Sequence, residues 1–264
     1  MSSFILGIPS NDMKNLLSVT AKTSIGSREK NQDVYYVDGR ISTENETQYE
    51  IQFEDDNKLH VFAVCDGIGQ YQYSGEVAAK ALEAIQKHQE KTNENLQSID
   101  LKRWCEEALI CANLAIRESK LRGSTTIALL AIYQDEYVFV NSGDSPGYVV
   151  TNNNIQELSV RHNMATFKKL LGMQPCIGEE CILLHHLGEK EVVYGEKQDK
   201  MKDEAQTFIL CSDGVTNAFD EETLLKDIQE QQEADYFVEK SSQLENADNC
   251  TCIIIRITKA QYES

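Results

Sequence analysis

The sequence lacks the long apolar runs that membrane proteins need. No apolar run among its 264 residues approaches the roughly 20 residues of a membrane-spanning helix. The apolar patch Phe4–Ile8 is too short for a secretory signal and has no basic flank. These absences predict a cytoplasmic protein with no membrane partner.

Basic residues are also few. The chain has 25 lysines and arginines against 43 acidic residues, which gives a formal net charge of −18. Proteins that bind nucleic acid through a broad face neutralise its phosphates with lysine and arginine. The charge therefore argues against nucleic acid as a partner. Most of the acidic excess is expected on solvated surface, but a few aspartates lie in apolar surroundings where that explanation fails.

The eight cysteines include no Cys-x-x-Cys pair. Cys65 and Cys211 lie in apolar stretches, and Cys250 and Cys252 alternate along an expected strand, so that both would face one side. A zinc site is one interpretation, although the spacing differs from that of the common structural sites. Buried, reduced thiols explain these cysteines better.

The apolar spacing predicts strands and helices in separate blocks rather than in strict alternation, which favours an α+β sandwich over a doubly wound parallel sheet. Helices are expected at 75–92, 101–120, 221–231 and 234–244, with a short helical piece at 167–171. Strands are expected at 34–37, 59–65, 125–133, 137–141, 147–150, 208–211 and 251–257, and a loop or peripheral hairpin at 38–58. Without an internal repeat or a linker rich in proline or glycine, residues 1–264 are expected to form a single domain.

Several aspartates stand where apolar segments end. Asp66, Asp144 and Asp213 each follow an expected strand and lie beside a glycine, while Asp33 and Asp248 stand at two further element boundaries. Carboxylates that converge at strand ends are poorly solvated, so either protons or cations must neutralise them. Such oxygen ligands suit Mg²⁺ or Mn²⁺. The alternative is that each Asp-Gly pair only caps a turn.

Six segments resemble motifs of the metal-dependent type 2C (PPM) protein phosphatases, in the order of that family and over nearly the whole chain. The resemblance is closer to the bacterial members, and the six segments in register are a strong signal although each is weak alone. It implies a four-layer α-β-β-α sandwich, in which helices flank two central antiparallel sheets. The segments are Arg28–Asp33, Val64–Gly69 with Gly75–Glu76, Gly123–Thr126, Val140–Ser145, Cys211–Gly214 and Asp248–Thr251.

The resemblance also implies a set of metal ligands. Asp66 would bridge two ions, and the carbonyl of Gly67 would bind one of them. Asp213 and Asp248 would complete the ligands of one metal, and Asp33 would bind the other. The ions would be Mn²⁺ or Mg²⁺, because both accept oxygen ligands.

The implied activity is hydrolysis of phosphoserine and phosphothreonine in proteins. A water or hydroxide that bridges the two cations would attack phosphorus, and no phosphoenzyme would form, so Cys65 and Cys211 need not be nucleophiles. Arg28 would act with Asp66 in catalysis by gripping the substrate phosphate through its paired donors. Asp144 would help to hold a third, weaker metal.

Three departures from the family pattern leave the main metal ligands in place. Gln70 stands where the family often has a glycine, which predicts a reshaped loop beside the metals. Ile68 replaces a histidine that serves some members as proton donor, so metal-bound water or another group must protonate the leaving oxygen. Pro146 replaces an arginine. His162, next to Arg161, is a poor substitute donor, because the family uses the matching pair mainly for structure.

Residues 163–205 occupy the place of the family's flap, which shapes substrate access. This segment contains Cys176, Cys181, His185 and His186, and ordinary surface or core positions explain them better than a metal site does.

Two rival functions remain: a catalytically weak or silent relative that binds phosphoproteins, and a hydrolase of small phosphorylated metabolites. A silent relative would normally lack one of the metal aspartates, and none is missing. The polar helix surfaces favour a monomer.

Overall fold

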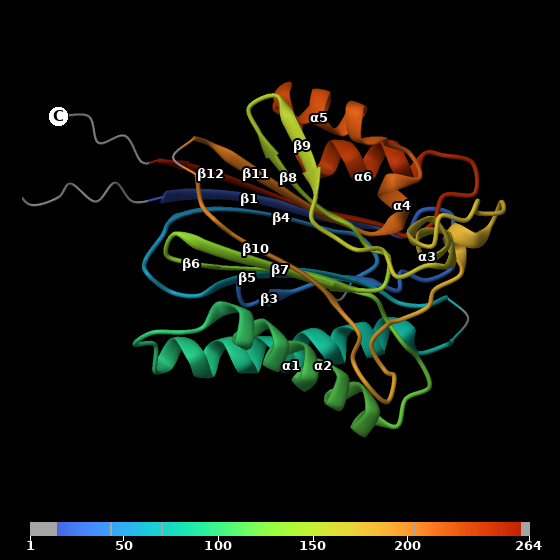
Figure 1. The fold of residues 1–264 in the computed structure, drawn as a ribbon, viewed down its shortest axis with the longest axis horizontal. Helices are drawn as coiled ribbons and strands as arrows, with labels where there is room; N and C mark the ends of the chain where they lie inside the picture. Colours follow the sequence, from blue (N-terminus) through green and yellow to red (C-terminus); the bar gives the residue numbers. More distant parts are fainter. Residues whose placement is uncertain (1–14, 43, 70, 203, 260–264) are drawn as a thin grey trace, which may run out of the picture.

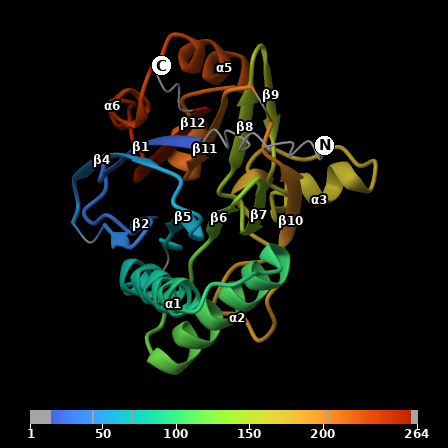
Figure 2. The same cartoon turned by 90° about the vertical axis from the view of Figure 1, so that its left-hand side faces the viewer.

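The structure, a computed structural model, describes residues 15–42, 44–69, 71–202 and 204–259. Phe4–Ile8 and Gln70, on which two of the expectations rest, lie outside these residues. Two antiparallel sheets pack face to face, and helices cover both outer faces (Figures 1 and 2). This arrangement confirms the four-layer α-β-β-α sandwich. Within the described residues, no helix is both long and apolar enough to cross a membrane.

The first sheet carries three helices on its outer face, α4 (Asp213–Thr216), α5 (Glu221–Gln229) and α6 (Ala234–Ser242). Phe237 and Ile254 are fully buried between the sheet and these helices. Cys250 and Cys252 lie in the same core, which confirms that they share a face. In spatial order the strands are β4 (Thr47–Glu54), β1 (Asn15–Ser24), β12 (Cys250–Lys259), β11 (Gln206–Cys211), β8 (Gly147–Thr151) and β9 (Asn154–Glu157).

The second sheet is covered by α1 (Ser74–Glu94) and α2 (Leu101–Ser119), which cross its outer face side by side (Figure 2). Both helices bury an apolar stripe against the sheet, as their spacing predicts. In spatial order the strands are β10 (Gly195–Lys200), β7 (Glu136–Ser142), β6 (Ile127–Tyr133), β5 (His60–Asp66), β2 (Asp33–Val37) and β3 (Arg40–Ile41).

Strand β5 shows how the layers position the chemistry. Phe62 and Val64 point into the core between the sheets, whereas Val61, Ala63 and Cys65 point into the core beneath α1 and α2. Both faces of the strand are therefore buried, and its register is fixed because a slip by one residue would exchange the two faces. The strand consequently delivers Asp66 to a defined place at the edge of the core.

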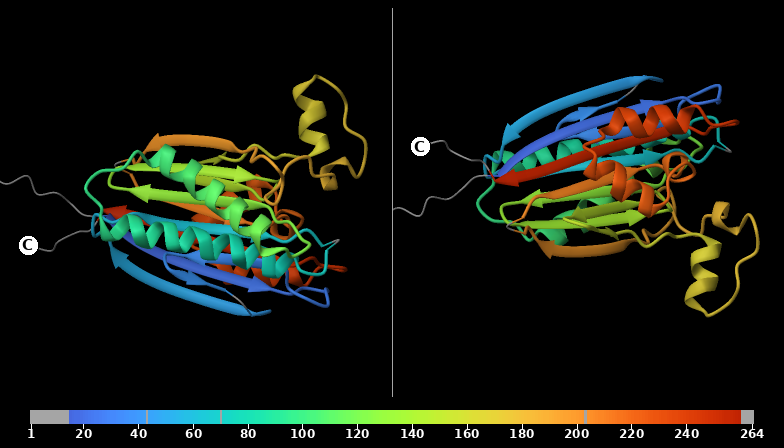
Figure 3. Two further views of the ribbon diagram at one scale, coloured as in Figure 1. Left: turned by 90° about the horizontal axis from the view of Figure 1, so that it is seen from below. Right: turned by 90° about the horizontal axis from the view of Figure 1, so that it is seen from above.

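Strands β4, β9 and β10 differ from the sequence-based expectation, and the short β3 falls in the hairpin allowed for at 38–58. Strand β4 lies in the range 38–58 and pairs with β1 along its whole length, so this range is more than a loop or hairpin. Strand β9 forms a hairpin with β8. Strand β10 lies within 163–205 and pairs with β7. The part of that segment that projects from the sandwich contains α3 (Met164–Leu170) and a 3₁₀ turn at Glu179–Cys181 (Figure 3).

Candidate metal centre

The aspartates at the strand ends meet at one end of the sandwich. Asp33 and Asp66 are directly opposite each other on β2 and β5. Asp213 follows β11, and Asp248 precedes β12. Four aspartates, Asp66, Asp144, Asp213 and Asp248, line one open cavity of about 900 Å³, and Asp33 is buried beside Asp66. Residues that are far apart in sequence thus contribute carboxylates to one place.

Asp33 has neither solvent nor a hydrogen-bond donor at its carboxylate. It is buried, and neither side-chain oxygen accepts a hydrogen bond. Burial raises its pKa to about 7; the nearby hydroxyls of Ser212 and Thr251 lower the pKa, and the charges of Asp213 and Asp248 raise it. An ionised carboxylate without donors is costly in such a place, so this group needs either a proton or a cation.

The neighbouring carboxylates show the same effect. Burial and then the charges of Asp33 and Asp213 raise the pKa of Asp66 well above its usual value. Burial raises the pKa of Asp144 to about 7, and it also raises the pKa of Asp213. Hard cations such as Mg²⁺ or Mn²⁺ fit this donor set, because they prefer carboxylate oxygens and would offset the crowded charge.

The aspartates are spread more widely than the ligands of a single ion. Among the described residues they form no group of three whose oxygens all lie within 4.8 Å of one another. Two-metal sites hold their cations about 3.5–4 Å apart and share ligands between them. Among the described residues, the cavity aspartates therefore form no ready-made three-carboxylate set for a single ion.

Gly67 allows the backbone to approach closely beside Asp66. Its N–H donates to the carbonyl of Gln32 at 3.1 Å. A Cβ atom at this position would lie 2.8 Å from that same carbonyl oxygen and 2.9 Å from Cβ of Ser74. Only glycine fits this contact, which places Gly67 on the cavity wall beside the strand end.

Arg28 lines the same cavity. Its Nη2 atom lies 2.6 Å from Oδ2 of Asp248, and the guanidinium remains about half exposed. A guanidinium that is paired on one side and exposed on the other can still present donors to a phosphate. The structure thus brings Arg28 to the carboxylates, as the sequence predicts.

Comparison with known proteins identifies the family. A model described as protein phosphatase 2C matches residues 39–248. The chain belongs to the protein phosphatase 2C family. The serine/threonine phosphatase stp of Listeria innocua is 28% identical over 82% of this chain and 92% of its own length.

Two solved structures share the fold of this 2C-family chain. The catalytic domain of the serine/threonine protein phosphatase PstP, crystallised with two manganese ions, has a TM-score of 0.73 and 19% identity, and the match covers 93% of this chain and all of that domain. The serine/threonine phosphatase of S. agalactiae has a TM-score of 0.74 and 18% identity over 90% of this chain and 98% of its own. At such identities the likeness establishes the fold.

Asn249 is a positioning residue to which the sequence analysis gave no role. Its Oδ1 accepts a hydrogen bond from the N–H of Gln32 at 2.9 Å. Its Nδ2 donates to the carbonyls of Ile25 at 2.9 Å and Lys30 at 3.0 Å. Asn249 therefore holds the loop that carries Arg28. The available signal was its place next to Asp248 in a segment that matches the 2C family.

Thr125 and Thr126 hold the backbone of Asp66. The hydroxyl of Thr126 accepts from the Asp66 N–H at 3.1 Å, and the hydroxyl of Thr125 donates to the Asp66 carbonyl at 2.9 Å. Thr126 also shares a hydrogen bond of 2.6 Å with the hydroxyl of Ser145. The segment 123–126, which matches a 2C-family motif, thus fixes the end of β5.

Ile68 and His162, which bear on the departures from the 2C pattern, have defined positions in the structure. Ile68 lines the cavity and carries no ionisable proton. The ring Nδ1 of His162 accepts from the backbone N–H of Gly143 at 3.2 Å, and the backbone N–H of His162 donates to the Gly143 carbonyl at 2.9 Å. His162 therefore supports the turn before Asp144. From segment 163–205, Cys181 reaches the cavity wall. Among the described residues, the cysteines and histidines of that segment form no group of three metal ligands.

Proposed function

We propose that this chain is a metal-dependent protein phosphatase that hydrolyses phosphoserine and phosphothreonine. The observation that carries the proposal is the meeting of Asp33, Asp66, Asp213 and Asp248 beside one cavity, with the oxygens of Asp33 buried and unpaired. Membership of the protein phosphatase 2C family and the 28% identity to a serine/threonine phosphatase support the same activity.

Asp66 would be the ligand shared by two cations, with the Gly67 carbonyl on one of them. Asp213 and Asp248 would complete one set of ligands, and Asp33 would bind the other ion. Bound cations supply Lewis acidity, which lowers the pKa of water and offsets negative charge on the phosphoryl group. The buried and unpaired oxygens of Asp33 support this assignment.

Arg28 would bind the substrate phosphate and offset charge on its oxygens during the reaction. Its ion pair with Asp248 on the cavity wall and its half-exposed guanidinium support this role, since a phosphate in the cavity could reach it. Asp144, on the same cavity, would help to hold a third and weaker ion. Because Cys65 and Cys211 are buried, which raises the pKa of both thiols, neither is proposed as a nucleophile.

The cations would be Mn²⁺ or Mg²⁺, and the two manganese ions of the PstP domain favour Mn²⁺. The substrates would be phosphorylated proteins rather than nucleic acid.

We also propose one phosphatase domain over residues 1–264, with segment 163–205 as the flap, since α3 projects beside the sheets (Figure 3). We also propose a cytoplasmic monomer; the free thiols suit that compartment, because it keeps cysteines reduced.

The direct test is hydrolysis of p-nitrophenyl phosphate and of a phosphothreonine peptide, with and without Mn²⁺ or Mg²⁺. We expect metal-stimulated turnover that falls about 100-fold or more in Asp66→Asn and in Asp213→Asn, the scale for loss of one preorganised charge at a reaction centre. The matched control is Asp135→Asn, an exposed aspartate paired with Lys200, which should keep full activity. Full activity in both cavity variants would refute the proposal.

The same assays separate the two rival functions. A silent phosphoprotein-binding relative would hydrolyse neither substrate with any metal, yet would still bind the phosphothreonine peptide. The retention of all the cavity aspartates disfavours this alternative. A hydrolase of small metabolites would turn over free phosphate esters and leave the peptide unchanged.

A further inference from the structure

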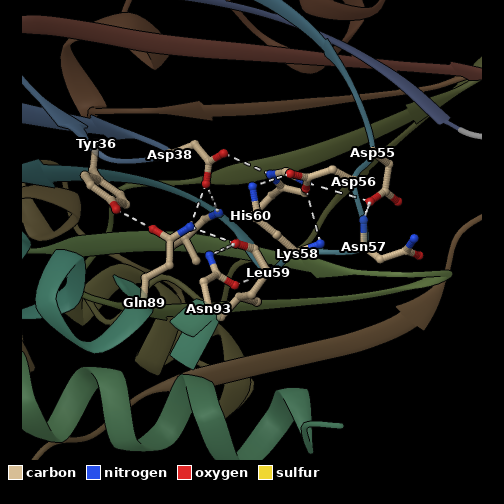
Figure 4. A network of polar contacts seen from close by, with 11 residues as sticks. Tyr36, Asp38, Asp55, Asp56, Asn57, Lys58, Leu59, His60, Gln89 and Asn93 are labelled. Carbon is tan, nitrogen blue, oxygen red and sulfur yellow. Dashed lines mark hydrogen bonds and ion pairs between the residues drawn. The ribbon is translucent and has the colours of Figure 1, made fainter. Parts of the chain in front are cut away.

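A second group of metal-binding side chains lies in the turn between β4 and β5. Asp55, Asp56 and His60 bring one oxygen or nitrogen atom each to within 4.8 Å of one another (Figure 4). His60 and Asp66 are six positions apart along β5, and at about 3.3 Å per residue the two lie about 20 Å apart. This group is therefore separate from the carboxylates of the cavity.

His60 points its free ring nitrogen at both carboxylates. The residue is only 4% exposed, and Nε2 makes no hydrogen bond. Nε2 lies 3.7 Å from Oδ1 of Asp55 and 3.5 Å from Oδ1 of Asp56. These separations exceed the usual hydrogen-bond range of about 2.7–3.2 Å. They are close to the roughly 3.4 Å between two ligands of a tetrahedral cation with bonds near 2.1 Å.

The other ring nitrogen fixes the orientation of the imidazole. Nδ1 of His60 lies 2.9 Å from Oδ2 of Asp38, so a proton on Nδ1 leaves the lone pair of Nε2 directed at Asp55 and Asp56. Histidines that bind metals characteristically donate the second ring N–H to a carboxylate in this way. Asp38 is itself held by Gln89, whose Nε2 donates to Oδ1 of Asp38 at 2.6 Å (Figure 4).

We propose that Asp55, Asp56 and His60 bind one transition-metal dication, with Zn²⁺ preferred and water completing its ligands. An imidazole nitrogen favours Zn²⁺ over Mg²⁺ or Mn²⁺, which prefer sets of oxygens only. The ion would tie together the crossover from the first sheet to the second, because β4 and β5 belong to different sheets. Asp38 would act as a positioning residue for His60.

Two groups compete with the cation. Nζ of Lys58 lies 2.5 Å from Oδ2 of Asp56 and already offsets part of its charge. Burial alone would lower the pKa of His60, but the hydrogen bond to Asp38 and the charges of Asp38 and Asp55 raise it to about 9. The alternative to a metal site is therefore a protonated His60 held between carboxylates. Removal of Lys58 distinguishes the metal site from the protonated His60. A metal site would bind Zn²⁺ more tightly once Lys58 no longer competes for Asp56.

The test is equilibrium dialysis of the full chain against Zn²⁺ in excess Mg²⁺, which occupies the sites made of oxygens only. We expect one Zn²⁺ per chain, at least about tenfold weaker binding in Asp56→Asn, and unchanged binding in the exposed control Asp135→Asn and in Asp66→Asn. Asp38→Asn should weaken binding by about 10- to 100-fold, the usual cost of losing the carboxylate behind a metal-binding histidine.

Lys58→Met should bind Zn²⁺ more tightly than the wild-type chain. The proposal is overturned if Asp56→Asn binds Zn²⁺ as tightly as Asp135→Asn does, or if Asp66→Asn alone removes the bound ion. Asp56 is well exposed, so Asp56→Asn should fold normally, and equal circular dichroism spectra of the variants would establish this. Phosphatase activity in Mn²⁺ should be unchanged in Asp56→Asn, whether or not Zn²⁺ is present.

Discussion

Replacement of Asp33 by asparagine tests whether the cavity carboxylates are held at a cost in stability. Burial raises the pKa of Asp33 from 3.8 to about 7. Each pKa unit corresponds to about 1.4 kcal/mol, so ionised Asp33 destabilises the metal-free fold by about 4 kcal/mol at pH 8. Because the folded-state pKa lies above the unfolded one, this cost is absent below about pH 4 and grows until the pH passes 7.

Asparagine has nearly the same shape as aspartate and carries no charge. A buried amide that lacks partners costs about 1–3 kcal/mol itself, which is less than the cost of the ionised carboxylate. We therefore expect Asp33→Asn to stabilise the metal-free protein at pH 8 by about 1–3 kcal/mol. The advantage should shrink by about 2–3 kcal/mol at pH 5, where folded Asp33 is already protonated.

The assay is urea unfolding in EDTA at pH 5 and pH 8, followed by the fluorescence of Trp104, the single tryptophan. Saturating Mn²⁺ should make the wild-type protein more stable than Asp33→Asn at pH 8, because the wild-type carboxylate gains a cation that the amide binds poorly. Metal-stimulated hydrolysis should be lost in the variant. Equal stabilities of the two proteins at pH 8 in EDTA, or a difference that does not change between pH 5 and pH 8, would refute this reasoning.

Three further substitutions test the geometry of the cavity. Arg28→Lys should raise KM for a phosphothreonine peptide about tenfold, measured by phosphate release, because an ammonium lacks the paired donors of guanidinium; an unchanged KM would count against a phosphate contact. Gly67→Ala should destabilise the fold by about 1–3 kcal/mol in urea unfolding, since its methyl group meets the Gln32 carbonyl. Asn249→Ala removes three hydrogen bonds and should cost about 2–3 kcal/mol and lower activity; wild-type stability would contradict its role in holding the loop.

The sequence was most informative where apolar strands end in acidic residues. The strands before Asp66 and Asp213 are buried on both faces, so they read as continuous apolar runs with abrupt ends. The order of the motifs then predicted that these ends meet. The supporting contacts could not be predicted, because the three hydrogen bonds of Asn249 join residues more than 200 positions apart.

Strand β4 was missed because its polar residues dominate the local composition. Tyr49, Ile51 and Phe53 alternate with polar residues and pack against the core between the sheets. That alternation is typical of an edge strand with one solvated face, and it was the available signal. Strand β10 offers no such pattern, since none of its residues is buried, and its pairing with β7 alone defines it.

The group around His60 was also invisible in the sequence. Asp55 and Asp56 read as part of a polar loop, and His60 reads as the second residue of the expected strand 59–65. What makes the group specific is the contact of Asp38 with the imidazole, which depends on the pairing of β2 with β5. Spacing along the chain carries no information on which ring nitrogen is left free.

Strand β5 links the two acidic groups, with His60 at its start and Asp66 at its end. Its interior is buried on both faces, so a cation at one end cannot shift the register at the other without moving side chains between two cores. Sites about 20 Å apart with no shared partner contribute additively to stability. The stabilisation by Zn²⁺ at His60 and that by Mn²⁺ at Asp66 should therefore add within about 0.5 kcal/mol in Mn²⁺–Zn²⁺ double titrations. A larger coupling would mean that the strand transmits strain between its ends.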